Sequence, residues 1–258
     1  MATTTAEVEP DKICTALDAG VFTITLNDVA GRNVLGVPLM NAFLAALERA
    51  ATDAAIRVVV VTNDGPVFCA GADLKAGPSD LAADLFRTLL RRVQTCPKPT
   101  IGKIRGHAVG GGVGLAAAFD IAVATEESKF GFTEVRLGVV PAVISAICLP
   151  KMRRSDALEM FLRGTRFEAP RAAELGLITR AVTSQGIDDE VAAITADIRL
   201  GGPEALRLTK QIVDEVPRME IDAALDAMAL LSARVFASDE ARKGTDAFKN
   251  RQSPPWVE

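Results

Sequence analysis

Short apolar runs in the first half of the chain have the length and composition of β-strands. Residues 13–17 and 21–26 are apolar or alternating around Asp18-Ala19-Gly20, a pattern that predicts a β-hairpin. Residues 58–62 read VVVVT, a continuous β-branched run typical of a strand covered on both faces. Three more strands are expected at residues 99–104, 120–124 and 178–182.

Helical spacing of apolar residues appears between these strands and dominates the end of the chain. A helix is expected from Pro38, because Met40, Phe43 and Leu47 keep one face apolar. Further helices are predicted at residues 79–94, 204–216, 220–236 and 239–250, with a mainly helical stretch from 155. We therefore expect a β/α core in residues 1–200 and a helical C-terminal region in residues 201–258. No internal sequence repeat is evident.

Composition excludes several classes of protein. Hydrophobic residues make up 49% of the 258 residues, and the net charge is −4 with a pI of about 5.3. No basic stripe points to nucleic acid, and no apolar run reaches membrane-spanning length. Residues 1–11 are polar and acidic, without the apolar segment of a signal peptide. The four cysteines are widely spaced and there is one histidine, so we expect no metal site, no disulfide framework and a reducing cytoplasmic setting.

Two stretches of small residues carry the candidate chemistry. Five glycines lie within the nine residues 106–114, before an alanine-rich helical run, and residues 67–75 also follow a predicted strand. Bare N–H groups at a helix start can bind a polarised oxygen. If the strands are neighbours, both stretches face one crevice, and one N–H from each could form an oxyanion hole.

Two other interpretations of the glycines stay open on the residues alone. The first is a tight turn that lets a helix pack closely on a sheet. The second is a dinucleotide site, because Gly112-x-Gly114-x-x-Ala117 fits a loose Rossmann fingerprint. The dinucleotide interpretation leaves the small residues around Ala70 unexplained.

Three motifs in order resemble the crotonase (enoyl-CoA hydratase/isomerase) family. They are Phe68-Cys69-Ala70-Gly71-Ala72-Asp73-Leu74-Lys75, Gly106-His107-Ala108-Val109-Gly110-Gly111-Gly112 and Phe132-Thr133-Glu134-Val135-Arg136-Leu137-Gly138. The resemblance runs from the first hairpin to Arg251. It implies an α/β spiral of ββα repeats, with a helical C-terminal region that forms a homotrimer or homohexamer. It also implies an acyl-CoA thioester substrate and no separate cofactor, because CoA is part of the substrate.

The resemblance also assigns roles to individual residues. The backbone N–H groups of Ala72 and Gly111 would form the oxyanion hole for the thioester carbonyl. Positions along CoA would be Ala70, Asp73, Leu74, Lys75, Gly110, Phe248 and Arg251, with Arg32 near the phosphates. Phe248 and Arg251 match positions that close over CoA, sometimes from a neighbouring subunit. The pattern of these last two residues also suits an ordinary amphipathic terminal helix.

The acid/base residues depart from the two-glutamate pattern of the family's hydratases. The first glutamate position is Gly114, and the second is present as Glu134. Apolar neighbours such as Phe130 and Phe132 should desolvate Glu134 and raise its pKa, which suits proton transfer near neutral pH. The alternative is a surface glutamate paired with Arg136.

One glutamate is compatible with more than one reaction. Residues 133–145 are similar to a bacterial branch of single-glutamate hydratases of branched or substituted enoyl-CoAs, which favours an enoyl-CoA hydratase. The alternatives are a Δ3,Δ2-enoyl-CoA isomerase, another crotonase reaction, or a catalytically silent acyl-CoA-binding paralogue. We expect structural roles for His107 and Asp120, and no reaction at the cysteines.

Overall fold

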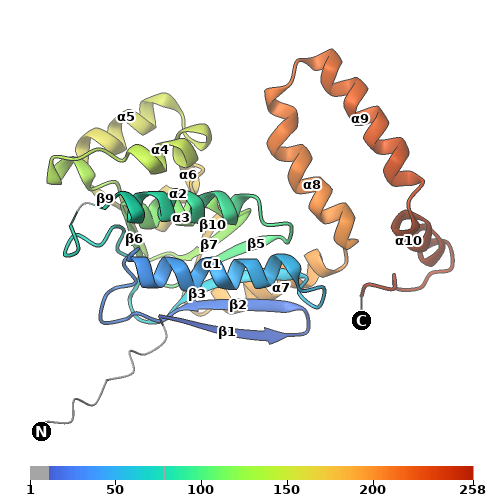
Figure 1. The fold of residues 1–258 in the computed structure, drawn as a ribbon, viewed down its shortest axis with the longest axis horizontal. Helices are drawn as coiled ribbons and strands as arrows, with labels where there is room; N and C mark the ends of the chain where they lie inside the picture. Colours follow the sequence, from blue (N-terminus) through green and yellow to red (C-terminus); the bar gives the residue numbers. More distant parts are fainter. Residues whose placement is uncertain (1–11, 78, 258) are drawn as a thin grey trace, which may run out of the picture.

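The computed structural model describes residues 12–77 and 79–257, so the expectation for residues 1–11 lies outside the described residues. Its strands form two sheets (Figure 1). The larger sheet contains, in spatial order, β1 (Ile13–Asp18), β2 (Val21–Leu26), β3 (Val58–Asn63), β5 (Thr100–Ile104), β7 (Ile121–Thr125) and β10 (Arg180–Val182). The smaller contains β4 (Val67–Cys69), β6 (His107–Val109), β8 (Lys129–Gly131) and β9 (Arg166–Glu168). Only the β1/β2 and β8/β9 pairs are antiparallel.

The chain repeats a strand–strand–helix unit in which each strand joins a different sheet. The three units are β3–β4–α2, β5–β6–α3 and β7–β8–α4, and their helices are α2 (Asp80–Gln94), α3 (Gly111–Ala118) and α4 (Ala142–Cys148). This repetition is the expected spiral of ββα turns. The sequence shows no matching repeat because the shared feature is backbone topology.

The remaining helices cover the sheets or follow them. They are α1 (Val37–Thr52), η1 (Glu134–Leu137), η2 (Leu149–Lys151), α5 (Arg154–Arg163), α6 (Ala169–Glu174), α7 (Ile187–Arg199), α8 (Pro203–Glu215), η3 (Val216–Arg218), α9 (Ile221–Phe236) and α10 (Asp239–Lys249). Strand β3 begins with four valines because both faces of the larger sheet are covered at this strand. Val59 and Val61 face the main core, whereas Val58 and Val60 pack with Ile187 of α7 on the other side of the sheet.

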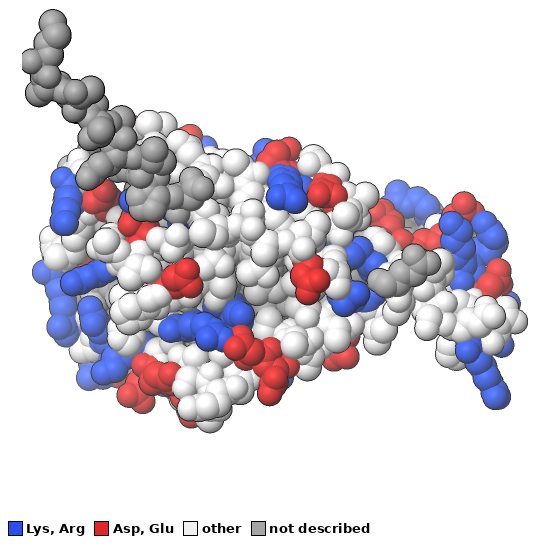
Figure 2. Space-filling model, turned by 90° about the horizontal axis from the view of Figure 1, so that it is seen from below, with Lys and Arg blue, Asp and Glu red and all other residues white. Residues whose placement is uncertain are grey.

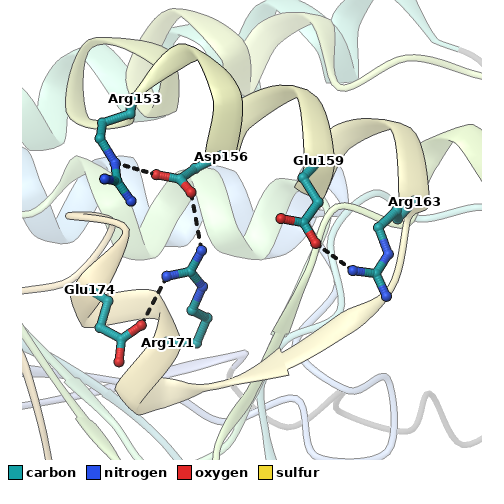
Figure 3. Close-up of polar contacts among 6 residues, drawn as sticks. All are labelled: Arg153, Asp156, Glu159, Arg163, Arg171 and Glu174. Carbon is teal, nitrogen blue, oxygen red and sulfur yellow. Dashed lines mark hydrogen bonds and ion pairs between the residues drawn. The ribbon is translucent and has the colours of Figure 1, made fainter.

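Arginine–carboxylate pairs join α5 to α6 (Figure 3). The buried carboxylate of Asp156 accepts from Arg153 Nε at 2.6 Å and from Arg171 Nη2 at 3.1 Å, and Arg171 also bonds Glu174 at 2.9 Å. The hydrogen bond from Arg153, followed by the charges of both arginines, lowers the pKa of Asp156. Since η1 packs against α5, this network helps to hold the segment that begins with Glu134.

The C-terminal helices, defined here as α8, η3, α9 and α10, project from one end of the molecule (Figures 1 and 2). Lys210 of α8 forms an ion pair with Asp120 at 2.6 Å. Arg57, in the loop before β3, donates to the carbonyl oxygens of Gly201 and Trp256, and the Trp256 indole donates to Leu200 at 2.9 Å. These polar contacts attach the C-terminal helices and the end of the chain to the core.

Most of the predicted elements are confirmed, and the smaller sheet is the main omission. The hairpin, the buried strand at 58–63, the helix capped by Ser79 and the three C-terminal helices appear within a few residues of their expected bounds. The strand expected to lead directly into the glycine turn, residues 99–104, is instead β5 of the larger sheet. A separate three-residue strand, β6, enters the turn. Strands of three residues are too short to show a period.

Candidate active site

The two small-residue stretches meet at the ends of neighbouring parallel strands. β4 pairs with β6 through Val67 and His107, so the loops that follow leave the same edge of the sheet. Gly71 has φ +85°, and a Cβ at Gly71 would lie 2.7 Å from the Val109 oxygen and 3.0 Å from the Gly111 nitrogen. Only glycine fits this approach, so the two stretches lie against each other at one edge of the smaller sheet; the crevice between them stays a prediction.

The N–H groups of Ala72 and Gly111 are free to bind a substrate oxygen. Gly111 is the first residue of α3, so its N–H has no acceptor within the helix. Throughout the described ranges, neither N–H donates a hydrogen bond to the protein. The adjacent carbonyl of Gly71, in contrast, is fixed by the Leu35 N–H at 2.8 Å.

Two apolar side chains flank Gly111. Its Cβ position would lie 3.0 Å from Leu35 Cδ1 and 3.3 Å from Phe86 Cζ. Hydrogen bonds to an oxygen here would form beside apolar atoms, where electrostatic interactions are stronger than in water. Sequence reasoning missed Leu35; the only signal was an apolar residue closing the polar loop at 27–36.

The Glu134 carboxylate lies beside the start of α3. A Cβ at Gly110 would be 3.3 Å from Glu134 Oε1, and Oε2 is buried without a hydrogen-bond partner. Burial raises the pKa of Glu134, as the sequence predicted. The alternative pairing with Arg136 is wrong: among the described residues no ion pair joins the two side chains, and the Arg136 guanidinium donates to the Arg163 carbonyl at 3.4 Å.

The position of the absent first glutamate is occupied from the opposite helix. A Cβ on Gly114 would lie 2.2 Å from Ile144 Cγ2, and Ile144 is 2% exposed. At this end of α3, the Glu134 carboxylate therefore lies beside Gly110, while an apolar side chain fills the space beside Gly114.

The residues expected along CoA fall into two groups. In the loop after β4, Ala70 N–H donates to the Arg32 carbonyl at 3.1 Å, and Asp73 Oδ1 accepts from the N–H of Lys75 at 3.0 Å. Leu74 and Lys75 are exposed there. Gly110 precedes Gly111 at the helix start.

Phe248 and Arg251 are not brought to this loop within one chain. Phe248 is 84% exposed on α10, and α10 stands apart from α2 and α3 (Figure 1). Their assignment to CoA stays a prediction.

The residues expected to be structural make structural contacts. His107 Nδ1 accepts from the Lys129 N–H at 3.1 Å, and burial followed by nearby cations lowers its pKa. Asp120 accepts from the Thr100 N–H at 2.7 Å and from its hydroxyl at 3.0 Å. Cys69 is buried beside the glycine turn with its pKa raised to about 12, which keeps the thiol protonated. All four cysteines are free.

Comparisons with known proteins agree with this geometry. Residues 16–258 match the model of the enoyl-CoA hydratase/isomerase family. The chain is 32% identical to the 2,3-dehydroadipyl-CoA hydratase of Escherichia coli, covering 91% of this chain and 94% of that protein. It is 30% identical to the enoyl-CoA isomerase/hydratase fer4 of Mycosarcoma maydis, covering 98% and 97%.

A solved enoyl-CoA hydratase of Mycobacterium smegmatis has the same fold. It superposes with a TM-score of 0.90 at 28% identity, over 97% of this chain and 100% of that chain. In the described part of the chain, no helix combines the length and apolar character needed to cross a membrane.

Proposed function

The chain belongs to the enoyl-CoA hydratase/isomerase family, and from this premise we propose that it hydrates 2-enoyl-CoA thioesters with Glu134 as acid and base. The observation that carries this proposal is the Glu134 carboxylate, half-buried beside Gly110 with one unpartnered oxygen. A carboxyl with a pKa raised by burial can accept and return a proton near neutral pH. Dinucleotide binding is not needed to explain the glycines.

The N–H groups of Ala72 and Gly111 would activate the substrate. The thioester carbonyl oxygen accepts both hydrogen bonds, which strengthen as negative charge develops on it. Donors of this kind contribute about 2.7–4 kcal/mol each to transition-state stabilisation. The polarised carbonyl makes the β-carbon electrophilic and the α-carbon able to take up a proton.

Glu134 would then complete the addition of water. Its carboxylate accepts a proton from a water molecule as the water oxygen bonds to the β-carbon, and the double-bond electrons move to the enolate oxygen. The protonated Glu134 next donates to the α-carbon, and the carbonyl re-forms. One carboxylate serves both steps and ends unchanged, and no separate cofactor is consumed because CoA is part of the substrate.

The CoA portion would lie along the loop after β4, which supplies Ala70, Asp73, Leu74 and Lys75, and against Gly110. Lys75 is exposed and offers an ammonium to a phosphate. Phe248 and Arg251 would close over CoA from a neighbouring copy, which fits their distance from this loop within one chain (Figure 1).

We propose that the chain assembles as a homotrimer or homohexamer through the C-terminal helices. One face of α9 carries three exposed apolar side chains, because steps of four and of eleven residues return to about the same side of a helix. These residues are Ile221, Leu225 and Phe236. They are 69%, 62% and 80% exposed. Apolar surface of this kind marks an interaction site.

The direct test is hydration of 2-enoyl-CoA thioesters of graded size, followed by loss of the conjugated absorbance. Glu134→Gln should lower kcat by about 100- to 10,000-fold, the range for removal of a general acid/base, with little change in KM. Glu127→Gln is the control, because Glu127 is an exposed glutamate away from the turn. Wild-type turnover by Glu134→Gln would overturn the role of this residue.

A second candidate, Δ3,Δ2-enoyl-CoA isomerisation, is supported by the apolar contact at Gly114. One carboxylate can carry a proton between two carbons without water. In that case a 3-enoyl-CoA gains conjugated absorbance while 2-enoyl-CoAs are not hydrated. Binding of CoA thioesters without either reaction would contradict both candidates and point to another crotonase reaction or a silent paralogue.

A further inference from the structure

The contact between Gly114 and Ile144 is too close for any side chain at position 114. A Cβ there would lie 2.2 Å from Ile144 Cγ2, 2.7 Å from its Cβ and 3.5 Å from its Cα. The second of these atoms is fixed by the backbone of α4, so rotation about χ1 does not relieve the clash. Position 114 must therefore be glycine while residue 144 carries a Cβ.

Ile144 and the Glu134 carboxylate contact positions one helical turn apart at the start of α3. Gly114 lies about one turn beyond Gly110 on α3, with its N–H donating to the Gly110 carbonyl at 3.4 Å. Glu134 lies over Gly110, and Ile144 lies over Gly114. Cys148, four residues after Ile144 on α4, has its pKa raised to about 12 by burial and also by the Glu134 charge.

We propose that Ile144 keeps position 114 of α3 closed to any side chain, so that Glu134 acts as the single acid/base group at this end of the helix. This inference rests on the proposed function. Ile144 is a positioning residue: it packs against the helix that carries the oxyanion donor, and it takes no part in proton transfer.

A coupled pair of substitutions tests the steric part. Gly114→Glu alone should lower Tm by about 8 °C and activity at least about 100-fold, because the new side chain overpacks the α3–α4 contact. Adding Ile144→Gly removes both blocking atoms and should raise the Tm above that of Gly114→Glu, while the lost packing of a buried isoleucine keeps it below the wild type. Adding Ile144→Val instead keeps Cβ and Cγ2 and should restore nothing. Equal Tm values for the two double variants would overturn the proposal.

The pH dependence of kcat/KM tests the chemical part. Gly114→Glu/Ile144→Gly should show an additional titration absent from the wild type, and its ratio of hydration to isomerisation should rise at least about tenfold. Gly114→Gln/Ile144→Gly is the matched control, equal in shape but without a titratable group. Identical profiles for these two double variants would contradict the role of Ile144.

These outcomes separate the inference from the proposed function. If the wild type converts neither 2-enoyl- nor 3-enoyl-CoA, the proposed function fails, while the Tm values of the two double variants still report whether Ile144 excludes a side chain at position 114. If the wild type is active and the two double variants have equal Tm values, the inference fails alone.

Discussion

Helices α3 and α9 differ in how much of their surface one chain can bury. Seven of the eight residues of α3 are buried, whereas Ala224 is the buried residue of the sixteen in α9. Backbone and side-chain atoms crowd the glycines of α3, while large apolar side chains of α9 face solvent. The contrast shows that one chain buries α3 almost completely, whereas α9 keeps an exposed apolar face that the proposed assembly would bury.

The largest expected effect comes from adding one carbon atom to the crowded helix. A Cβ at Gly112 would lie 2.2 Å from the carbonyl oxygen of Cys69 and 2.9 Å from its carbonyl carbon. Both are backbone atoms of β4, so the two loops of the site would have to separate. Gly112→Ala should lower the free energy of unfolding by about 3 kcal/mol, the upper range for overpacking, as measured by urea denaturation.

The control for this substitution is Gly138→Ala. Gly138 has φ +72° with no atom within 4 Å of its Cβ position, so it isolates the backbone strain, about 1 kcal/mol. Equal losses for Gly112→Ala and Gly138→Ala would show that the crowding of α3 has no energetic weight.

The sequence predicted the strands and helices whose residue pattern extends over many positions. Continuous β-branched residues identified β3, and periodic apolar residues identified α1 and the C-terminal helices. Small residues at Gly71 and Gly111 indicated that two backbones approach each other, and the structure confirms it, because a Cβ on Gly71 would lie 3.0 Å from Gly111 N. Apolar neighbours correctly predicted the raised pKa of Glu134.

The contacts that sequence reasoning could not predict lie between distant segments. Leu35 reaches Gly111 and Ile144 reaches Gly114, but neither pairing leaves a trace in local spacing. The smaller sheet was missed because β4, β6, β8 and β9 have three residues each. The division at residues 200 and 201 and the assignment of Phe248 and Arg251 stay predictions.

A charge on the exposed face of α9 should act between copies and leave the single chain folded. Leu225→Glu places a carboxylate where the proposed assembly buries an apolar side chain, at a cost of about 2 kcal/mol per copy. The expected result is dissociation to a smaller species by light scattering, with the helical circular dichroism retained. Ala223→Glu adds the same charge at an exposed position of α9 away from that face and should keep the assembly. Dissociation by both variants, or by neither, would contradict the proposal that the assembly buries this face of α9.

The smallest expected effect is a pH-dependent gain in stability at the site itself. Burial raises the pKa of Glu134, so the folded chain holds this proton to a higher pH than the unfolded chain does. Relative to Glu134→Gln, the wild type should therefore lose stability as pH rises from the ordinary carboxyl range, about 4.3, through the raised pKa. We expect Glu134→Gln to be more stable by about 1 kcal/mol at neutral pH, the scale for a buried unpartnered polar group, with little difference in acid.

Urea denaturation across this pH range measures the difference in unfolding free energy between the wild type and Glu134→Gln. The control is Glu127→Gln, which replaces an exposed glutamate and should show no such difference. A gap for Glu134→Gln that does not change with pH would mean that the carboxylate is not desolvated in the folded chain. The Glu134 carboxylate would then be solvated, in contrast to the buried residues of α3.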